Sequence, residues 1–118
     1  MTRLLLEAQL ETCKRFSAIH FPFKDDDTVY FATTTRGLLP VNGERINPER
    51  GESGWYIWCG VERKADKDFF EKISLYELSD RAPLVQAFLG LPPGYRFLIA
   101  GAHQKAWYDT DLKVHPIT

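Results

Sequence analysis

The feature that most constrains this chain is the run 54–60, GWYIWCG, in which apolar and aromatic side chains stand between two glycines. Alternate side chains of an extended strand point to opposite faces, so Trp55, Ile57 and Cys59 share one face. Tyr56 and Trp58 share the other. Because neither face is polar, the run is typical of a central strand covered on both sides. A partly exposed face used for binding is the alternative.

Composition and charge restrict the class of protein. The chain has 118 residues, of which 44% are hydrophobic, and this predicts one folded domain over residues 1–118. Fifteen Lys and Arg residues against sixteen Asp and Glu residues give a formal charge of −1. Nucleic-acid-binding proteins usually carry a basic excess, so we expect no nucleic acid as a partner.

The cysteines and the N-terminal segment bear on the compartment. Cys13 and Cys59 lie far apart in the sequence, and lone thiols in a chain able to build its own core are typical of a reducing environment. The apolar run 4–6 is interrupted at Glu7, which is too early for a signal peptide or a membrane span. We therefore expect a cytoplasmic protein without a membrane partner.

Residues 2–18 are predicted to form an amphipathic helix that begins at Thr2. Helical spacing places Leu6, Leu10, Cys13 and Ser17 on one stripe, and the charged residues of the segment fall mostly away from it. Leu5 and Phe16 lie beside this stripe and complete the apolar face that the sequence predicts.

The β-branched and aromatic residues at 28–33 predict a strand. The pair Asn42-Gly43 then predicts a two-residue hairpin turn between the segments 38–41 and 44–46. The following polar run 47–51 predicts an exposed turn.

Further along the chain, residues 73–77 predict a strand with Ile73, Leu75 and Glu77 on one face. A second helix is predicted near residues 79–90, capped by Ser79 or Asp80. Its predicted apolar set is Leu84, Val85, Phe88 and Leu89. Strands at 95–100 and 106–108 follow. The predicted fold class is α+β, a small single domain with a mostly antiparallel sheet packed by the N-terminal helix and the second helix.

Three segments between residues 53 and 99, SGWYIWCGVE, DFFEKISLYELSDRAP and LVQAFLGLPPGYRFLI, resemble the bacterial immunity protein 33 domain family and its relatives. Val61 departs from the family pattern, which has an acidic or small residue after this glycine. The resemblance implies a small cytosolic protein that neutralises a toxin encoded beside it by binding the toxin directly. It supplies no catalytic residues, so it implies neither an enzyme nor a cofactor.

The residues offer little catalytic chemistry of their own. Cys59 ends an apolar strand, which favours a structural thiol over a nucleophile. His20, His103 and His115 lack metal-ligand spacing, and the acidic runs 25–27 and 109–111 lack the glycine and distal glutamate of a calcium loop. We therefore expect no metal site.

The candidate contacts with a protein partner come from charge and expected exposure. They are two acidic groups, one before the strand at 28–33 and one in the charged loop 62–68. Their members are Asp25, Asp26, Asp27, Glu62, Asp66 and Asp68.

Two other hypotheses remain open at this level. One is a small hydrolase of unknown substrate, in which Cys59 or a carboxylate pair meets a histidine. The other is a regulatory or scaffold domain that forms a homodimer through an apolar face of its sheet.

Overall fold

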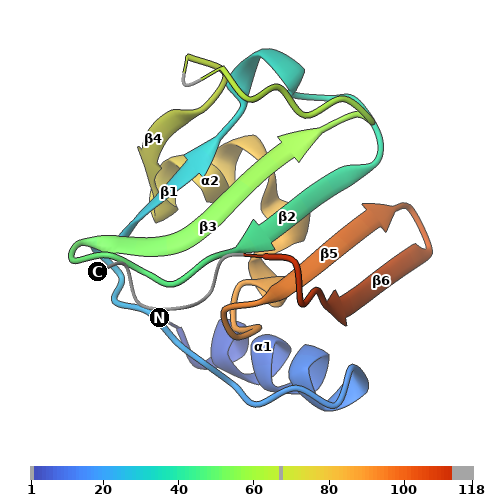
Figure 1. Ribbon diagram of the computed structural model, residues 1–118. Coiled ribbons are helices and arrows are strands. Elements are labelled where there is room, and N and C mark those ends of the chain that lie inside the picture. The colour runs from blue at the N-terminus through green and yellow to red at the C-terminus, as the bar shows by residue number, and fades with distance from the viewer. Residues whose placement is uncertain (1, 67, 113–118) are drawn as a thin grey trace.

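The computed structural model describes residues 2–66 and 68–112 as a six-stranded sheet with its helices packed on one face (Figure 1). The strand order is β4-β1-β3-β2-β5-β6. Only β1 and β3 pair in parallel; the other neighbours are antiparallel. The predicted α+β class with a mostly antiparallel sheet is confirmed. No helix in the described ranges is long and apolar enough to cross a membrane.

The bounds of the elements are as follows. The helices are α1 (Arg3–Arg15) and α2 (Leu75–Arg81), with two 3-10 segments, η1 (Thr33–Thr35) and η2 (Pro83–Phe88). The strands are β1 (Thr28–Phe31), β2 (Val41–Arg45), β3 (Glu52–Cys59), β4 (Glu71–Ser74), β5 (Tyr95–Ala100) and β6 (His103–Tyr108).

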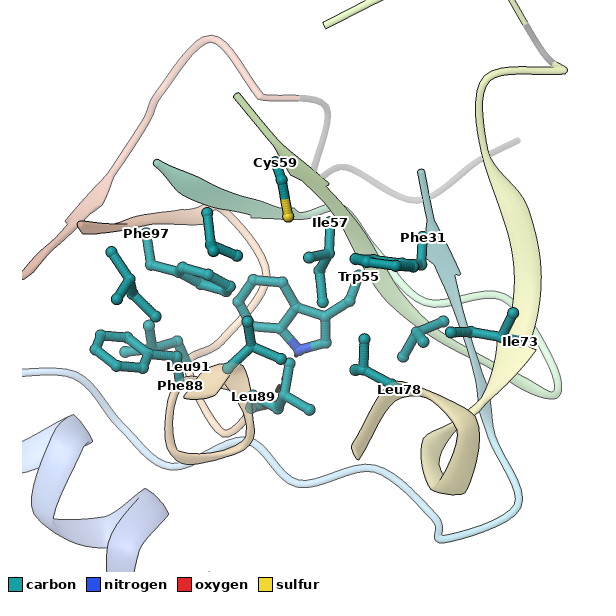
Figure 2. Close-up of a cluster of buried hydrophobic side chains, with 14 of the residues drawn as sticks. Phe31, Trp55, Ile57, Cys59, Ile73, Leu78, Phe88, Leu89, Leu91 and Phe97 are labelled. Atoms are coloured by element: carbon teal, nitrogen blue, oxygen red, sulfur yellow. Dashed lines mark hydrogen bonds between the residues drawn. The ribbon is translucent and has the colours of Figure 1, made fainter. Parts of the chain in front are cut away.

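Strand β3 is the interior strand that the sequence predicts. Trp55 and Ile57 have no exposed surface, and Cys59 lies beside them on the helix side of the sheet. Figure 2 shows Trp55 at the centre of this core, with Phe97 and Phe31 on either side of its indole ring. The indole Nε1 donates a 2.9 Å hydrogen bond to the carbonyl of Leu89, so the largest core side chain is also satisfied as a donor.

The hairpin predicted at Asn42-Gly43 is wrong, because both residues lie inside β2. The chain turns later, through residues 46–51, where the exposed turn that the sequence predicts connects β2 to β3. The glycine at position 43 is explained by packing rather than by a turn. A Cβ atom at this position would lie 2.2 Å from Cε2 of Phe97, so only glycine lets the ring cover the strand.

The second helix begins earlier than the predicted range 79–90, and neither Ser79 nor Asp80 caps it. The strand ends at Ser74, and α2 begins at once with a capping box in which Ser74 and Glu77 bond each other's backbone N–H groups. The α-helix ends at Arg81 and η2 begins at Pro83, because proline has no N–H group with which to continue the helical hydrogen bonds of α2. Leu84 is 67% exposed, so it is not part of the core face.

The N-terminal helix begins at Thr2 as predicted, and Cys13 and Phe16 of the predicted apolar face pack in or against the core, but the rest of the buried face differs. Its buried residues are Gln9, Thr12 and Cys13, whereas Leu6 and Leu10 are exposed. The Gln9 amide donates to the carbonyl of Gln86 and its oxygen contacts His20, so a polar side chain is satisfied at the centre of the contact. The buried face of α1 is therefore centred on Gln9 and Cys13 and leaves Leu6 and Leu10 exposed.

The remaining strand predictions are confirmed with changed lengths. β1 ends at Phe31 rather than at residue 33, and β5 has the predicted bounds. β6 begins at His103, three residues earlier than the predicted strand at 106–108, because the turn after β5 is tight.

The contact between Gly43 and Phe97 can be tested by substitution. We expect Gly43→Ala to lower the free energy of unfolding by about 1–3 kcal/mol, because the added methyl group overpacks the core. Chemical denaturation measures the change. In a Phe97→Leu background the same substitution should cost clearly less, and equal costs in both backgrounds would contradict the packing argument.

Candidate functional site

The face of the sheet opposite the helices carries a row of six side chains, one from each strand. They stand directly opposite one another in the pairing register, so they form a line across the whole sheet. We call this line the transverse row: Lys72, Tyr30, Tyr56, Glu44, Arg96 and Trp107, in the order of the strands. The alternation that places Trp55 and Ile57 in the core places these residues on the open face.

Tyr30 and Tyr56 form the aromatic half of the row, and contacts between aromatic rings hold them in position. Tyr30 and Tyr56 stack with centroids 4.7 Å apart, and Phe70 meets Tyr56 edge-on at 5.2 Å. Phe70 also lies edge-on to Trp58, which is 6% exposed. The segment that follows β3 therefore anchors on this face, and Phe70 covers the side of β3 that the core does not.

Lys72 closes the aromatic end of the row. Its ammonium group lies 3.2 Å from the Glu52 carboxylate and 5.7 Å from the centre of the Tyr30 ring. The hydrogen bond to Glu52 raises the pKa of Lys72. The hydroxyl of Tyr30 donates to the same carboxylate at 3.3 Å, so three side chains order one another.

The charged half of the row is centred on Glu44, whose carboxylate lies between two arginines. Oε1 accepts hydrogen bonds from Arg63 Nε at 3.0 Å and Nη2 at 2.7 Å, and Oε2 accepts from Arg96 Nη1 at 2.7 Å. Arg96 also donates to Asp109, and the pKa of Asp109 is lowered, first by a backbone N–H bond from Asp111 and then by Arg96. Hydrogen-bonded charges of this kind have fixed positions.

Arg63 links the two halves. Its guanidinium lies 5.0 Å from the Phe70 ring centre and 5.4 Å from that of Trp58. A hollow of about 390 Å³ lies beside it, lined by Glu44, Ile46, Arg63, Arg96, Asp111 and Leu112. The open face thus offers ordered arginine and aromatic groups around a shallow hollow, which suits contact with a protein surface.

The acidic residues predicted as contacts are placed in two separate groups. Asp25, Asp26 and Asp27 precede β1, and the Asp27 carboxylate accepts a 2.9 Å hydrogen bond from the backbone N–H of Lys24. Glu62, Asp66 and Asp68 are exposed in the segment that follows β3. Because β1 and β3 are parallel, the two groups lie at opposite ends of the sheet. Only the second group belongs to the segment that carries Arg63 and Phe70.

Cys59 is enclosed in the way expected of a structural thiol. It is 4% exposed and belongs to the core cluster, and burial raises the pKa of its thiol. The hollow of about 450 Å³ beside it is lined by Thr34, Thr35, Leu38, Cys59, Gly60, Val61, Glu62, Lys64 and Phe69. This lining contains no histidine, so the Cys–His pairing needed by the hydrolase hypothesis is not formed there.

The histidines are dispersed. His20 contacts Gln9 at 2.9 Å, and its pKa is lowered by burial and then by the charge of Arg45. His103 is exposed at the start of β6, and His115 lies outside the described residues. Within residues 2–66 and 68–112 no group of three His, Cys, Asp or Glu side chains could hold a metal ion.

Sequence reasoning missed the charged half of the row. Reading the run 41–45 as a single strand would have placed Glu44 on the face of Tyr56, but the Asn42-Gly43 pair suggested a turn. Arg63 and Arg96 carry no local signal, because their common partner Glu44 is distant from both in sequence.

These features define a small α+β protein with an ordered open sheet face and a buried thiol. The chain matches the Imm33-like domain over residues 8–109, and it belongs to the Imm33-like family. The match extends the resemblance found at residues 53–99 to most of the chain. Neither a curated protein nor a solved structure gives a significant match.

The burial of the thiols predicts their reactivity. We expect neither Cys13 nor Cys59 to react with iodoacetamide in the native protein at pH 8, because burial raises both pKa values and removes access. Mass spectrometry should detect alkylation of both only in denaturant. Rapid native labelling of Cys59 would return it to consideration as a nucleophile.

The network at Glu44 predicts a stability effect. We expect Glu44→Gln to lower the free energy of unfolding by about 1–3 kcal/mol, because a nearly buried carboxylate that holds two arginines is lost. Urea denaturation measures this. The matched control Glu62→Gln removes an exposed carboxylate and should change stability by less than about 0.5 kcal/mol. Equal effects of the two substitutions would contradict the assignment.

Proposed function

We propose that this protein is an immunity protein that binds a cognate bacterial toxin in the cytoplasm and neutralises it without catalysing a reaction. The observation that carries the proposal is the match to the Imm33-like domain over residues 8–109. The buried state of Cys59 supports the non-catalytic part, because the thiol best placed in the sequence to be a nucleophile is part of the core.

The open face supports binding as the mode of action. Tyr, Trp and Arg side chains dominate the energetics of protein interfaces, and this face presents all three. The side chains of Arg63 and Arg96 are 35% and 28% exposed while their positions are held by Glu44. A partner that contacts them therefore meets groups that have already lost most of their conformational freedom, which lowers the entropic cost of association.

The acidic residues are proposed to steer the toxin. Glu62, Asp66 and Asp68 are exposed on the segment that borders the open face, where they form one side of a charged rim. Asp25, Asp26 and Asp27 form a second acidic group at the other end of the sheet. Negative charge at the rim accelerates association with a basic toxin surface and contributes less to the lifetime of the complex.

Co-expression tests the function. The protein should restore growth to cells that express the toxin encoded beside its gene, and purified toxin and protein should form a complex. Absence of both protection and complex formation would refute the proposal.

A charge-reversal variant tests the steering. We expect Glu62→Lys with Asp66→Lys and Asp68→Lys to slow association with this toxin by about tenfold or more at low salt, and high salt should reduce the difference. Stopped-flow measurement gives the rate. The matched control Glu7→Lys with Glu11→Lys and Asp80→Lys makes the same change in net charge on other exposed residues. Equal slowing by both variants would mean that net charge, rather than the rim, steers the toxin.

A further inference from the structure

The two edges of the sheet differ in how they are protected. Strand β4 is one edge, and its four residues carry Glu71 and Lys72, which are paired with Arg81 and Glu52. Short, charged edge strands resist pairing with another chain. Strand β6 is the other edge, with six residues in unbroken register with β5 and a single formal charge, on Lys105 (Figure 1).

The β5–β6 hairpin determines which backbone groups of β6 face outward. Ala100 pairs with His103, so the connection is a two-residue turn and this first pair exchanges hydrogen bonds. The alternation then directs the backbone groups of Lys105 and Trp107 toward β5. The N–H and C=O groups of Gln104 and Ala106 point away from the sheet, and no strand in the described part of the chain pairs with them.

We propose that a second copy of this chain pairs with β6 in antiparallel orientation, so that two six-stranded sheets join into one. Outward-facing residues must pair with outward-facing residues, which restricts the register. A twofold axis at Ala106 pairs residues 104–108 of each strand. It places Lys105 of each copy opposite Trp107 of the other, where an ammonium group and an indole attract.

Neighbouring registers are less favourable. Moving the axis to Lys105 places the two lysines opposite each other, and like charges directly opposite are destabilising. Moving it to Trp107 leaves only residues 106–108 of β6 paired. The axis at Ala106 therefore gives the longest pairing without opposed charges, and the strand is complementary to itself.

The surface beside the edge fits the same arrangement. A hollow of about 420 Å³ follows the strand and is lined by Phe16, Gln104, Lys105, Ala106 and Trp107. Directly opposite residues share a face, so the second copy brings its Tyr108 opposite Gln104, next to this hollow. Trp107 and Tyr108 are 41% and 51% exposed in the single chain, and pairing removes part of both from water. The inference does not rest on toxin binding.

Sedimentation velocity over a range of protein concentrations tests the proposal. The native chain should sediment with twice the chain mass at high concentration. Ala106→Pro should raise the dissociation constant of the dimer by about tenfold or more, because it removes two symmetry-related interchain hydrogen bonds. The lost N–H group points outward, so the β5 pairing remains and the melting temperature should change little. A native chain that stays monomeric at every concentration would overturn the proposal.

The register has a separate test that does not depend on proline. Trp107→Lys should weaken the dimer because it opposes lysines, and adding Lys105→Glu to the same chain should restore it through opposite charges. A dimer that is insensitive to Ala106→Pro and to the charge substitutions would place the interface elsewhere and refute the inference. If Ala106→Pro does not fold, the charge substitutions decide alone.

Discussion

The fold depends on the burial of one guanidinium group. Arg45, at the end of β2, has no exposed surface, and burial lowers its pKa to about 10. It donates to the carbonyls of Ser53 at 2.9 Å, Phe21 at 2.6 Å and Leu91 at 2.8 Å, while its Nη2 has no hydrogen-bond partner among the described residues. A buried cation is costly unless its donors are satisfied, so these carbonyls must stay in place around it. One side chain thereby joins β3, the connection after α1 and the turn before β5.

Aromatic rings complete this environment. The guanidinium carbon lies 5.1 Å from the ring centre of Phe21, 5.4 Å from that of Phe23 and 5.6 Å from that of Trp55. Trp55 in turn bonds the carbonyl of Leu89, so the turn that leads into β5 is held by two neighbouring donors. Cation–π attraction is strongest away from water, which suits a cation placed on the core side of the sheet.

The same strand connects this interior to the open face of the sheet. Gly43 and Arg45 lie on the helix side of β2. Gly43 leaves room for the Phe97 ring, and the Arg45 guanidinium donates to backbone carbonyls. Glu44, between them, must then point to the open face, where it holds Arg63 and Arg96. The positions of Arg63 and Arg96 are therefore a consequence of core packing, and a rigid interior supplies the ordered surface on which the proposed binding depends. The β6 edge differs, because no strand in the described part of the chain pairs with its outward side.

Local sequence determined the elements whose signals lie within a few residues. The alternation in 54–60 identified the interior strand, and Thr2 identified the start of α1. The Ser74–Glu77 capping box also has a local sequence signal, but the sequence analysis assigned residues 73–77 to a strand instead. Tertiary structure alone decided the rest. Asn42 and Gly43 lie in a strand, where the absence of a side chain at Gly43 lets the Phe97 ring pack against the backbone. The transverse row forms because the pairing register aligns six segments that are distant in sequence. Register and close approach depend on residues far along the chain, which local patterns do not encode.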